Sequence, residues 1–126
     1  MGVVFALARD EAVQIDQARL GTLYHQLGAA GADRIIGRAS RELSARTARC
    51  QRLWEAGDNS GLCKCARSMI PVAEQAGMTE FAKVARHVTS AAAGQDAVAL
   101  AATLARLRRV GDGSLRAVRQ VRGMMV

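Results

Sequence analysis

Apolar side chains recur every three or four residues along almost the whole 126-residue chain, which is the period of a helix that buries one face. The pattern is clearest between residues 33 and 56, where arginines occupy the opposite face. Alanine and arginine are the two commonest residues, and there is a single proline. These residues favour helix over sheet, so we predict an all-α protein and no strand.

Glycine-containing segments divide the pattern into five predicted helices, because glycine commonly ends a helix. Asp10 is the predicted N-cap of the first helix and Thr79 that of the fourth. The sequence GDG at 111–113 either breaks the fifth helix or marks a bend in it. The predicted helices cover residues 11–27, 33–56, 60–76, 79–94 and 96 onward.

Amphipathic helices joined by short turns cannot bury their apolar stripes alone, so they are expected to pack together. A chain of 126 residues has the size of one domain. We therefore predict that residues 1–126 form one antiparallel four-helix bundle, in which residues 11–27 form a short additional N-terminal helix.

Several features point to the cytoplasm. No apolar run approaches the roughly 20 residues that a membrane-spanning helix needs. The first ten residues lack the basic start and long apolar region of a signal peptide. Three cysteines, an odd number, favour reduced thiols over a disulfide framework. We expect a cytoplasmic protein that makes no contact with a membrane.

The formal net charge of +7 is unevenly distributed. Residues 1–62 hold eight basic and seven acidic groups, whereas residues 63–126 hold ten basic and four acidic groups. This asymmetry suits nucleic acid, an anionic membrane surface or an acidic protein partner, and charge alone does not choose among them.

The stretch from Gly57 to Leu104 carries a recognisable spacing. A GD turn at residues 57–58 leads into a helix that contains Ala66 and closes at Gly77, and a second glycine and aspartate turn follows at residues 94–96. This arrangement resembles the histidine-containing phosphotransfer (Hpt) domain, a helical-bundle module of bacterial phosphorelays. The resemblance implies an Hpt-like four-helix bundle and a role in two-component signal transduction.

The residues that would carry the chemistry depart from the family pattern. Arg67 stands at the position of the phosphorylated histidine, Ile70 at that of the lysine and Pro71 at that of the glycine. A neutral imidazole nitrogen can attack phosphorus near neutral pH, whereas a guanidinium stays protonated and has no lone pair to offer. We therefore expect no phosphotransfer at Arg67, and neither enzymatic activity nor a cofactor.

The histidine face of the resembled family docks on the acidic phosphorylation pocket of a receiver domain. The resemblance therefore implies a non-phosphorylatable adaptor or modulator that binds a response-regulator receiver domain or a histidine kinase, and a homodimer remains open. The predicted partner-binding residues are Lys64, Arg67, Ser68, Ile70, Pro71 and Glu74.

Two alternatives remain open. His87, on the fourth predicted helix, could be a displaced phosphoacceptor, although no lysine and glycine follow it at the family's spacing. The basic C-terminal segment could instead neutralise the phosphates of a nucleic acid. Its arginines are Arg106, Arg108, Arg109, Arg116, Arg119 and Arg122.

The pair Cys63 and Cys65 suggests a metal ligand pair at first sight. Side chains two residues apart on a helix point away from each other, and a structural zinc site needs four convergent ligands. We therefore predict that Cys65 lies in the core, that Cys63 is partly exposed, and that neither holds a metal. His25 is interpreted as a residue at a helix C-terminus, where it interacts with the helix dipole.

Overall fold

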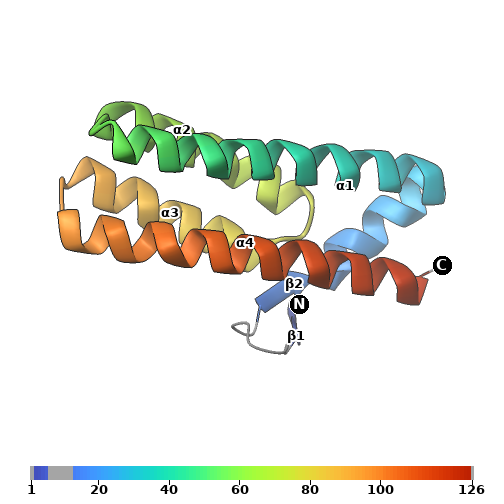
Figure 1. Cartoon of the computed structure of the whole chain (residues 1–126). Coiled ribbons are helices and arrows are strands. Elements are labelled where there is room, and N and C mark those ends of the chain that lie inside the picture. The colour runs from blue at the N-terminus through green and yellow to red at the C-terminus, as the bar shows by residue number, and fades with distance from the viewer. Residues whose placement is uncertain (1, 6–12, 126) are drawn as a thin grey trace.

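The computed structural model describes residues 2–5 and 13–125. This part of the chain forms an antiparallel four-helix bundle in which one pair of helices lies over the other (Figure 1). The predicted all-α bundle is confirmed. The helices are α1 (Gln17–Glu55), α2 (Asn59–Gln75), α3 (Thr79–Ala93) and α4 (Ala97–Met125).

The additional N-terminal helix is present as the first part of α1. Gly28 has a φ of +73° and a ψ of 172°, and this single residue kinks the helix sharply. The predicted break at residues 28–32 is therefore reduced to one glycine, which adopts a backbone conformation that other residues rarely reach. The predicted start at residue 11 is wrong, because α1 begins at Gln17 and Asp16 caps it by accepting a hydrogen bond from the amide of Arg19 at 3.0 Å. Asp10 lies outside the described residues.

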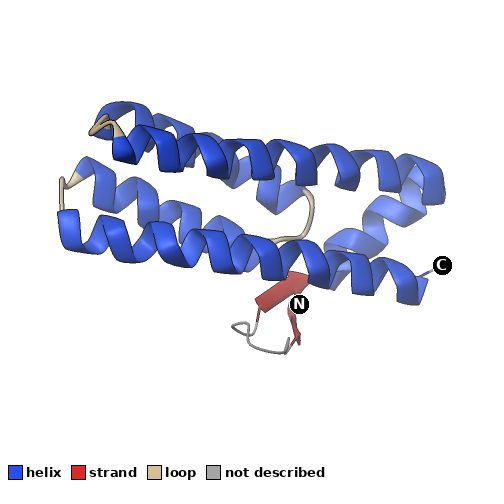
Figure 2. Cartoon of the chain, in the orientation of Figure 1, coloured by secondary structure: helices blue, strands red, loops and turns tan. Residues whose placement is uncertain are grey.

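Two short strands, β1 (Gly2–Phe5) and β2 (Val13–Asp16), pair antiparallel beside the bundle, where a helix and no strand was predicted (Figure 2). Val13 and Ile15 are fully buried and Gln14 is exposed, which is the alternation of a strand with one buried face. The amide of Asp16 donates to the carbonyl of Gly77 at 2.8 Å. The strand thus forms where the chain meets the turn between α2 and α3.

The turns follow the glycines of the sequence. Gly57 and Gly77 have φ values of +72° and +75°, and each follows the end of a helix. The carboxylates of Asp58 and Asp96 accept hydrogen bonds from amides in the first turns of α2 and α4, at 2.8 and 3.0 Å. The prediction that Thr79 caps α3 is wrong.

Met78 occupies the N-cap position of α3 without a side-chain hydrogen bond. The hydroxyl of Thr79 donates to the carbonyl of Gln14 in β2, at 3.0 Å. A contact with a distant strand has therefore taken the place of the local cap.

Helix α4 runs without interruption through residues 111–113, although GDG predicted a break or a bend. A Cβ added to Gly111 would lie 3.1 Å from Cε2 of Phe81, so the glycine allows the buried ring of α3 to approach α4 closely. Packing between the helices decides the conformation here, against the weak helix propensity of glycine.

The spacing of the apolar residues in the sequence also predicts which side chains of each helix face inward, and all of those predicted for α2 and α3 are buried. Two predicted core residues of α1 are more exposed than expected: Leu27, beside the kink, is 48% exposed, and Trp54, in the last turn, is 37% exposed. Ala97 and Ala101 of α4 are also exposed. The inner residues of α2 and α3 are Leu62, Cys65, Ala66, Met69, Ala73, Ala76, Phe81, Val84, Ala85 and Val88.

Among the helices of the described chain, none is both long and apolar enough to pass through a bilayer.

Candidate functional site

The outer face of α2 carries the residues expected to contact a partner. Lys64, Arg67, Pro71 and Glu74 follow one another at spacings of three and four residues, so they form one stripe, and all four are exposed. We call this set the α2 stripe. Ser68 is exposed beside it, whereas Ile70 is half-buried and packs against the core. Ile70 therefore offers less free apolar surface than the sequence suggested.

Arg67 is an exposed cation in the middle of this stripe. Its Nη2 lies 3.5 Å from Sγ of Cys63, one helical turn earlier, and the thiol in turn faces the carbonyl of Thr89 in α3 at 3.7 Å. Arg67 forms no ion pair with a carboxylate of the described residues. The guanidinium charge is thus available to a partner.

Pro71 lies inside α2 and the helix continues beyond it. Because proline has no amide hydrogen, it cannot donate the helical hydrogen bond that the carbonyl of Arg67 would accept. The next carbonyl along, that of Ser68, accepts a hydrogen bond from Nη1 of Arg46 in α1 at 2.9 Å. A side chain of the neighbouring helix therefore supports the backbone close to the proline.

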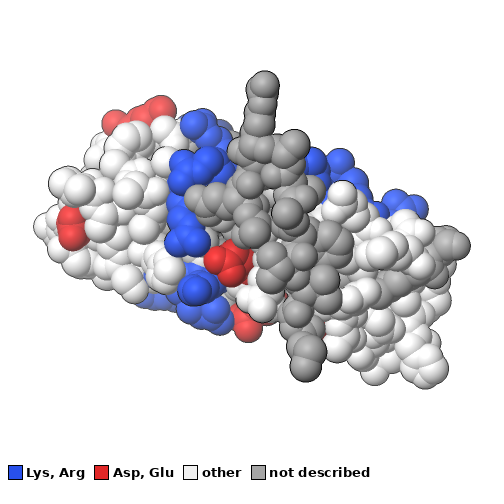
Figure 3. All heavy atoms as spheres, turned by 90° about the horizontal axis from the view of Figure 1, so that it is seen from below, with Lys and Arg blue, Asp and Glu red and all other residues white. Residues whose placement is uncertain are grey.

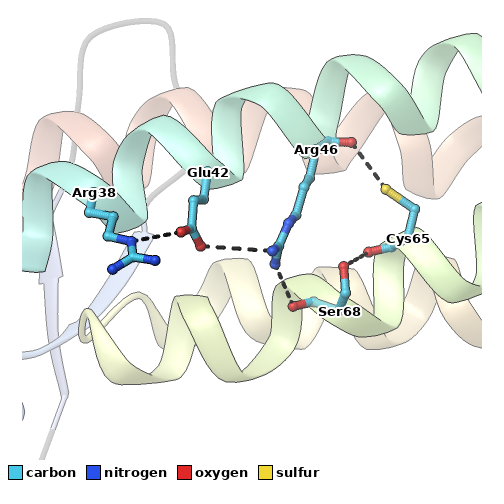
Figure 4. Close-up of polar contacts among 5 residues, drawn as sticks. All are labelled: Arg38, Glu42, Arg46, Cys65 and Ser68. Carbon is cyan, nitrogen blue, oxygen red and sulfur yellow. Dashed lines mark hydrogen bonds and ion pairs between the residues drawn. The ribbon is translucent and has the colours of Figure 1, made fainter.

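Arg46 belongs to a polar network that joins α1 to α2 (Figure 4). The carboxylate of Glu42 forms ion pairs with two arginines: Oε1 lies 3.0 Å from Nε of Arg38, and Oε2 lies 3.8 Å from Nη2 of Arg46. The thiol of Cys65 donates to the backbone carbonyl of Arg46 at 3.5 Å. The hydroxyl of Ser68 donates to the backbone carbonyl of Cys65 at 2.7 Å. The network holds the middle of α2 against α1.

Sequence reasoning missed Arg46. It is one of several arginines on the polar side of the predicted second helix, and its spacing does not distinguish it from the others. Its half-buried position, which follows from the packing of α2 on α1, is the feature that separates it.

Glu74 closes the stripe at its C-terminal end. It accepts a hydrogen bond from Nη2 of Arg86 in α3 at 2.7 Å, and both side chains are about half exposed. This ion pair neutralises the acidic charge locally, so the free charge of the α2 stripe is cationic and comes from Lys64 and Arg67. A surface pair of this kind contributes little to stability, about 0–1 kcal/mol.

The three thiols are free, with Cys50 and Cys65 buried and Cys63 half-buried, as predicted for Cys63 and Cys65. Burial raises the pKa of Cys50 to about 12, and its contact with Cys65 acts in the same direction. A thiol with so high a pKa is a poor nucleophile. Within the described chain, no three His, Cys, Asp or Glu side chains gather where they could hold a metal ion.

Neither histidine belongs to the α2 stripe. His87 is exposed on α3, and His25 is exposed on the first part of α1, before the kink. The possibility that His87 accepts a phosphoryl group remains a prediction.

The basic C-terminal segment is partly used within the fold. Arg106 pairs with Glu80 at 3.4 Å and Arg122 pairs with Asp33 at 2.9 Å. Arg109 and Arg116 also interact with other groups of the chain. On the face seen from below in Figure 1, Lys and Arg side chains form a band across the middle of the molecule, with acidic side chains among them (Figure 3).

Comparison of the chain with protein-family models, curated proteins and solved structures gives no significant match.

Proposed function

We propose that this protein is a signalling adaptor or modulator of a cytoplasmic two-component phosphorelay, and that its α2 stripe binds the receiver domain of a response regulator. One observation carries the proposal: Arg67, at the position that matches the phosphoacceptor histidine of the resembled family, is exposed in the middle of α2 and forms no ion pair with a described carboxylate.

The chemistry of the stripe suits an acidic pocket. An arginine guanidinium is always protonated and can bind a carboxylate through two parallel hydrogen bonds. Lys64, one turn earlier and also exposed, adds a second cation, and Pro71, one turn later, adds an apolar contact. Such a surface would occupy the receiver's phosphorylation pocket without taking its phosphoryl group, because the guanidinium offers no lone pair.

The network around Arg46 supports this role by fixing the site. Binding groups act best when the surrounding contacts hold them in place before the partner arrives. Arg46 bonds the Ser68 carbonyl, next to Arg67 in the chain, and Cys65 bonds back to α1. The α2 stripe therefore lies on a helix that side-chain hydrogen bonds hold against α1.

A substitution at Arg67 tests the proposal. Binding to a panel of receiver domains from the same organism would be measured by biolayer interferometry. Arg67→Glu reverses the charge that faces the acidic pocket, so we expect at least a tenfold loss of affinity, about 1.4 kcal/mol. The matched control is Arg119→Glu, which makes the same charge change at an exposed position of α4. Equal affinity of the Arg67→Glu variant and the unmodified protein would contradict the proposal.

The absence of phosphotransfer is tested separately. The protein would be incubated with acetyl phosphate or with a phosphorylated receiver, and its intact mass measured. We expect no added phosphoryl group. A phosphoryl group located on His87 would instead support the alternative of a displaced phosphoacceptor.

A further inference from the structure

The outer face of α1 presents a row of arginines. The residues are separated by intervals such as seven (34 to 41) and eleven (41 to 52 and 38 to 49), which return a side chain to nearly the same face of a helix. All are exposed, and they extend over about 27 Å at 1.5 Å per residue. We call this row the α1 arginine stripe, and its members are Arg34, Arg38, Arg41, Arg49 and Arg52.

Most of this charge is not neutralised within the fold. Arg38 pairs with Glu42, whereas the other four arginines of the stripe form no hydrogen bond or ion pair with the part of the chain that the structure describes. The acidic side chains of α1 have other partners: Asp33 bonds Tyr24 and Arg122, and Glu55 bonds Gln51. The near balance of charge in residues 1–62 therefore hides a strongly cationic surface.

The stripe differs in this respect from the basic C-terminal segment. Two of the arginines in that segment pair with Glu80 and Asp33, and Arg109 and Arg116 are engaged as well. A surface that binds a polyanion needs cations whose charge is available. Four such cations lie on one face of α1, whereas in the basic C-terminal segment only Arg108 and Arg119 have no partner among the described residues.

We infer that the α1 arginine stripe binds the phosphate backbone of a nucleic-acid duplex. α1 contains no lysine, so its permanent cations are all arginines, and the planar guanidinium matches a phosphate through two hydrogen bonds. Arg34, Arg38 and Arg41 also line a shallow surface hollow of about 550 Å³, together with Asp33 and Ile35. The row of cations lies in the part of α1 that follows the kink, and it suits a partner with many closely spaced anions.

Other anionic partners fit this surface less well. Ala45 and Ala48 lie between the arginines on this face, and Ile35, beside Arg34, is half-buried, so the stripe has no fully exposed large apolar side chain. Binding along a membrane surface relies on such side chains, and so do the central contacts of most protein interfaces. Because the stripe also lacks aromatic rings on which bases could stack, a duplex suits it better than a single strand.

This inference does not depend on the proposed receiver binding. The α1 arginine stripe and the α2 stripe lie on different helices and share no residue. If the double variant Arg41→Gln/Arg52→Gln loses duplex binding and keeps receiver binding, the two surfaces act independently.

Salt dependence provides the test. Binding of the whole protein to a fluorescent 20-base-pair DNA duplex of random sequence would be followed by anisotropy between 50 and 200 mM NaCl. Four unpaired arginines on four phosphates predict a slope of about −3.6 for log K against log salt, or roughly a 10²-fold loss of affinity across this range. The double variant Arg41→Gln/Arg52→Gln should reduce the steepness of the slope by about 1.8.

The matched control is the double variant Lys83→Gln/Arg119→Gln, which removes the same charge from exposed positions on α3 and α4. We expect this control to keep the slope of the unmodified protein, and circular dichroism to show that both variants are folded. The inference is overturned if the duplex does not bind or if both double variants lose affinity equally. Binding to phosphatidylserine vesicles but not to the duplex would also overturn it.

Discussion

Pro71 and Arg67 lie four residues apart on α2, the separation that a helical backbone hydrogen bond would normally join. The proline removes the amide that would bond the carbonyl of Arg67, and a proline inside a helix costs about 3 kcal/mol relative to alanine. The sequence correctly predicted that both side chains are exposed, because their spacing relative to the buried residues of α2 fixes which side of the helix they occupy. It did not reveal the Arg46 contact beside them, which comes from another helix.

Replacing Pro71 should stabilise the protein. Pro71→Ala restores an amide donor for the Arg67 carbonyl, and we expect the free energy of unfolding to rise by about 1–2 kcal/mol, since the more flexible unfolded chain offsets part of the gain. Urea denaturation would measure the change. Pro71→Gly serves as the comparison and should gain about 1 kcal/mol less than alanine. A loss of stability in the alanine variant would show that the proline ring contributes more through packing than it costs in hydrogen bonding.

At the scale of elements, β2 and the turn between α2 and α3 depend on each other. The Gly77 carbonyl accepts the amide of Asp16, and Thr79 bonds the Gln14 carbonyl. The sequence predicted the turn from its glycine but assigned residues 13–16 to a helix. The strand could not be predicted because its partners are β1 and a turn more than sixty residues away.

Two glycines with similar backbone conformations allow a matched test of this junction. A Cβ at Gly77 would lie 3.0 Å from the carbonyl oxygen of Asp16 and 3.1 Å from Cγ of Leu20, whereas a Cβ at Gly57 would meet open space. Both positions carry the backbone cost of a positive φ, about 1–2 kcal/mol. Gly77→Ala should therefore lose about 2–4 kcal/mol in urea denaturation and Gly57→Ala only the smaller amount. Equal losses of stability in the two variants would mean that Asp16 and Leu20 move aside for the added methyl group with no loss of free energy.

At the scale of the whole molecule, a cluster of three side chains connects the N-terminal part of α1 to the C-terminal part of α4. The hydroxyl of Tyr24, before the kink, donates to Oδ1 of Asp33 at 2.8 Å, and Arg122, near the end of α4, pairs with the same oxygen at 2.9 Å. Burial raises the pKa of Tyr24 to about 12, and the hydrogen bond to Asp33 adds to the effect. The cluster fixes the first part of α1 relative to α4.

This raised pKa makes stability depend on pH in the alkaline range. Between pH 10 and 12 the folded protein keeps the phenol proton that the unfolded chain releases, so the free energy of unfolding falls as the pH rises. The raised pKa of Cys50 acts in the same direction from pH 9 upward. Tyr24→Phe removes the first contribution, and its urea denaturation should show a shallower fall between pH 10 and 12. An unchanged slope in this variant would contradict the assignment.

The amino-acid sequence by itself determined the helical class, the buried faces of α2 and α3 and the glycine turns. These features are local: helical periodicity records which face is apolar, and a glycine permits a positive φ wherever it stands. Only the tertiary structure decided that residues 13–16 form a strand, that α4 continues through Gly111, and that four arginines on one face of α1 have no partner among the described residues. Each of these depends on contacts between residues far apart in the chain, such as Asp16 with Gly77 or Asp33 with Arg122, which no local pattern specifies.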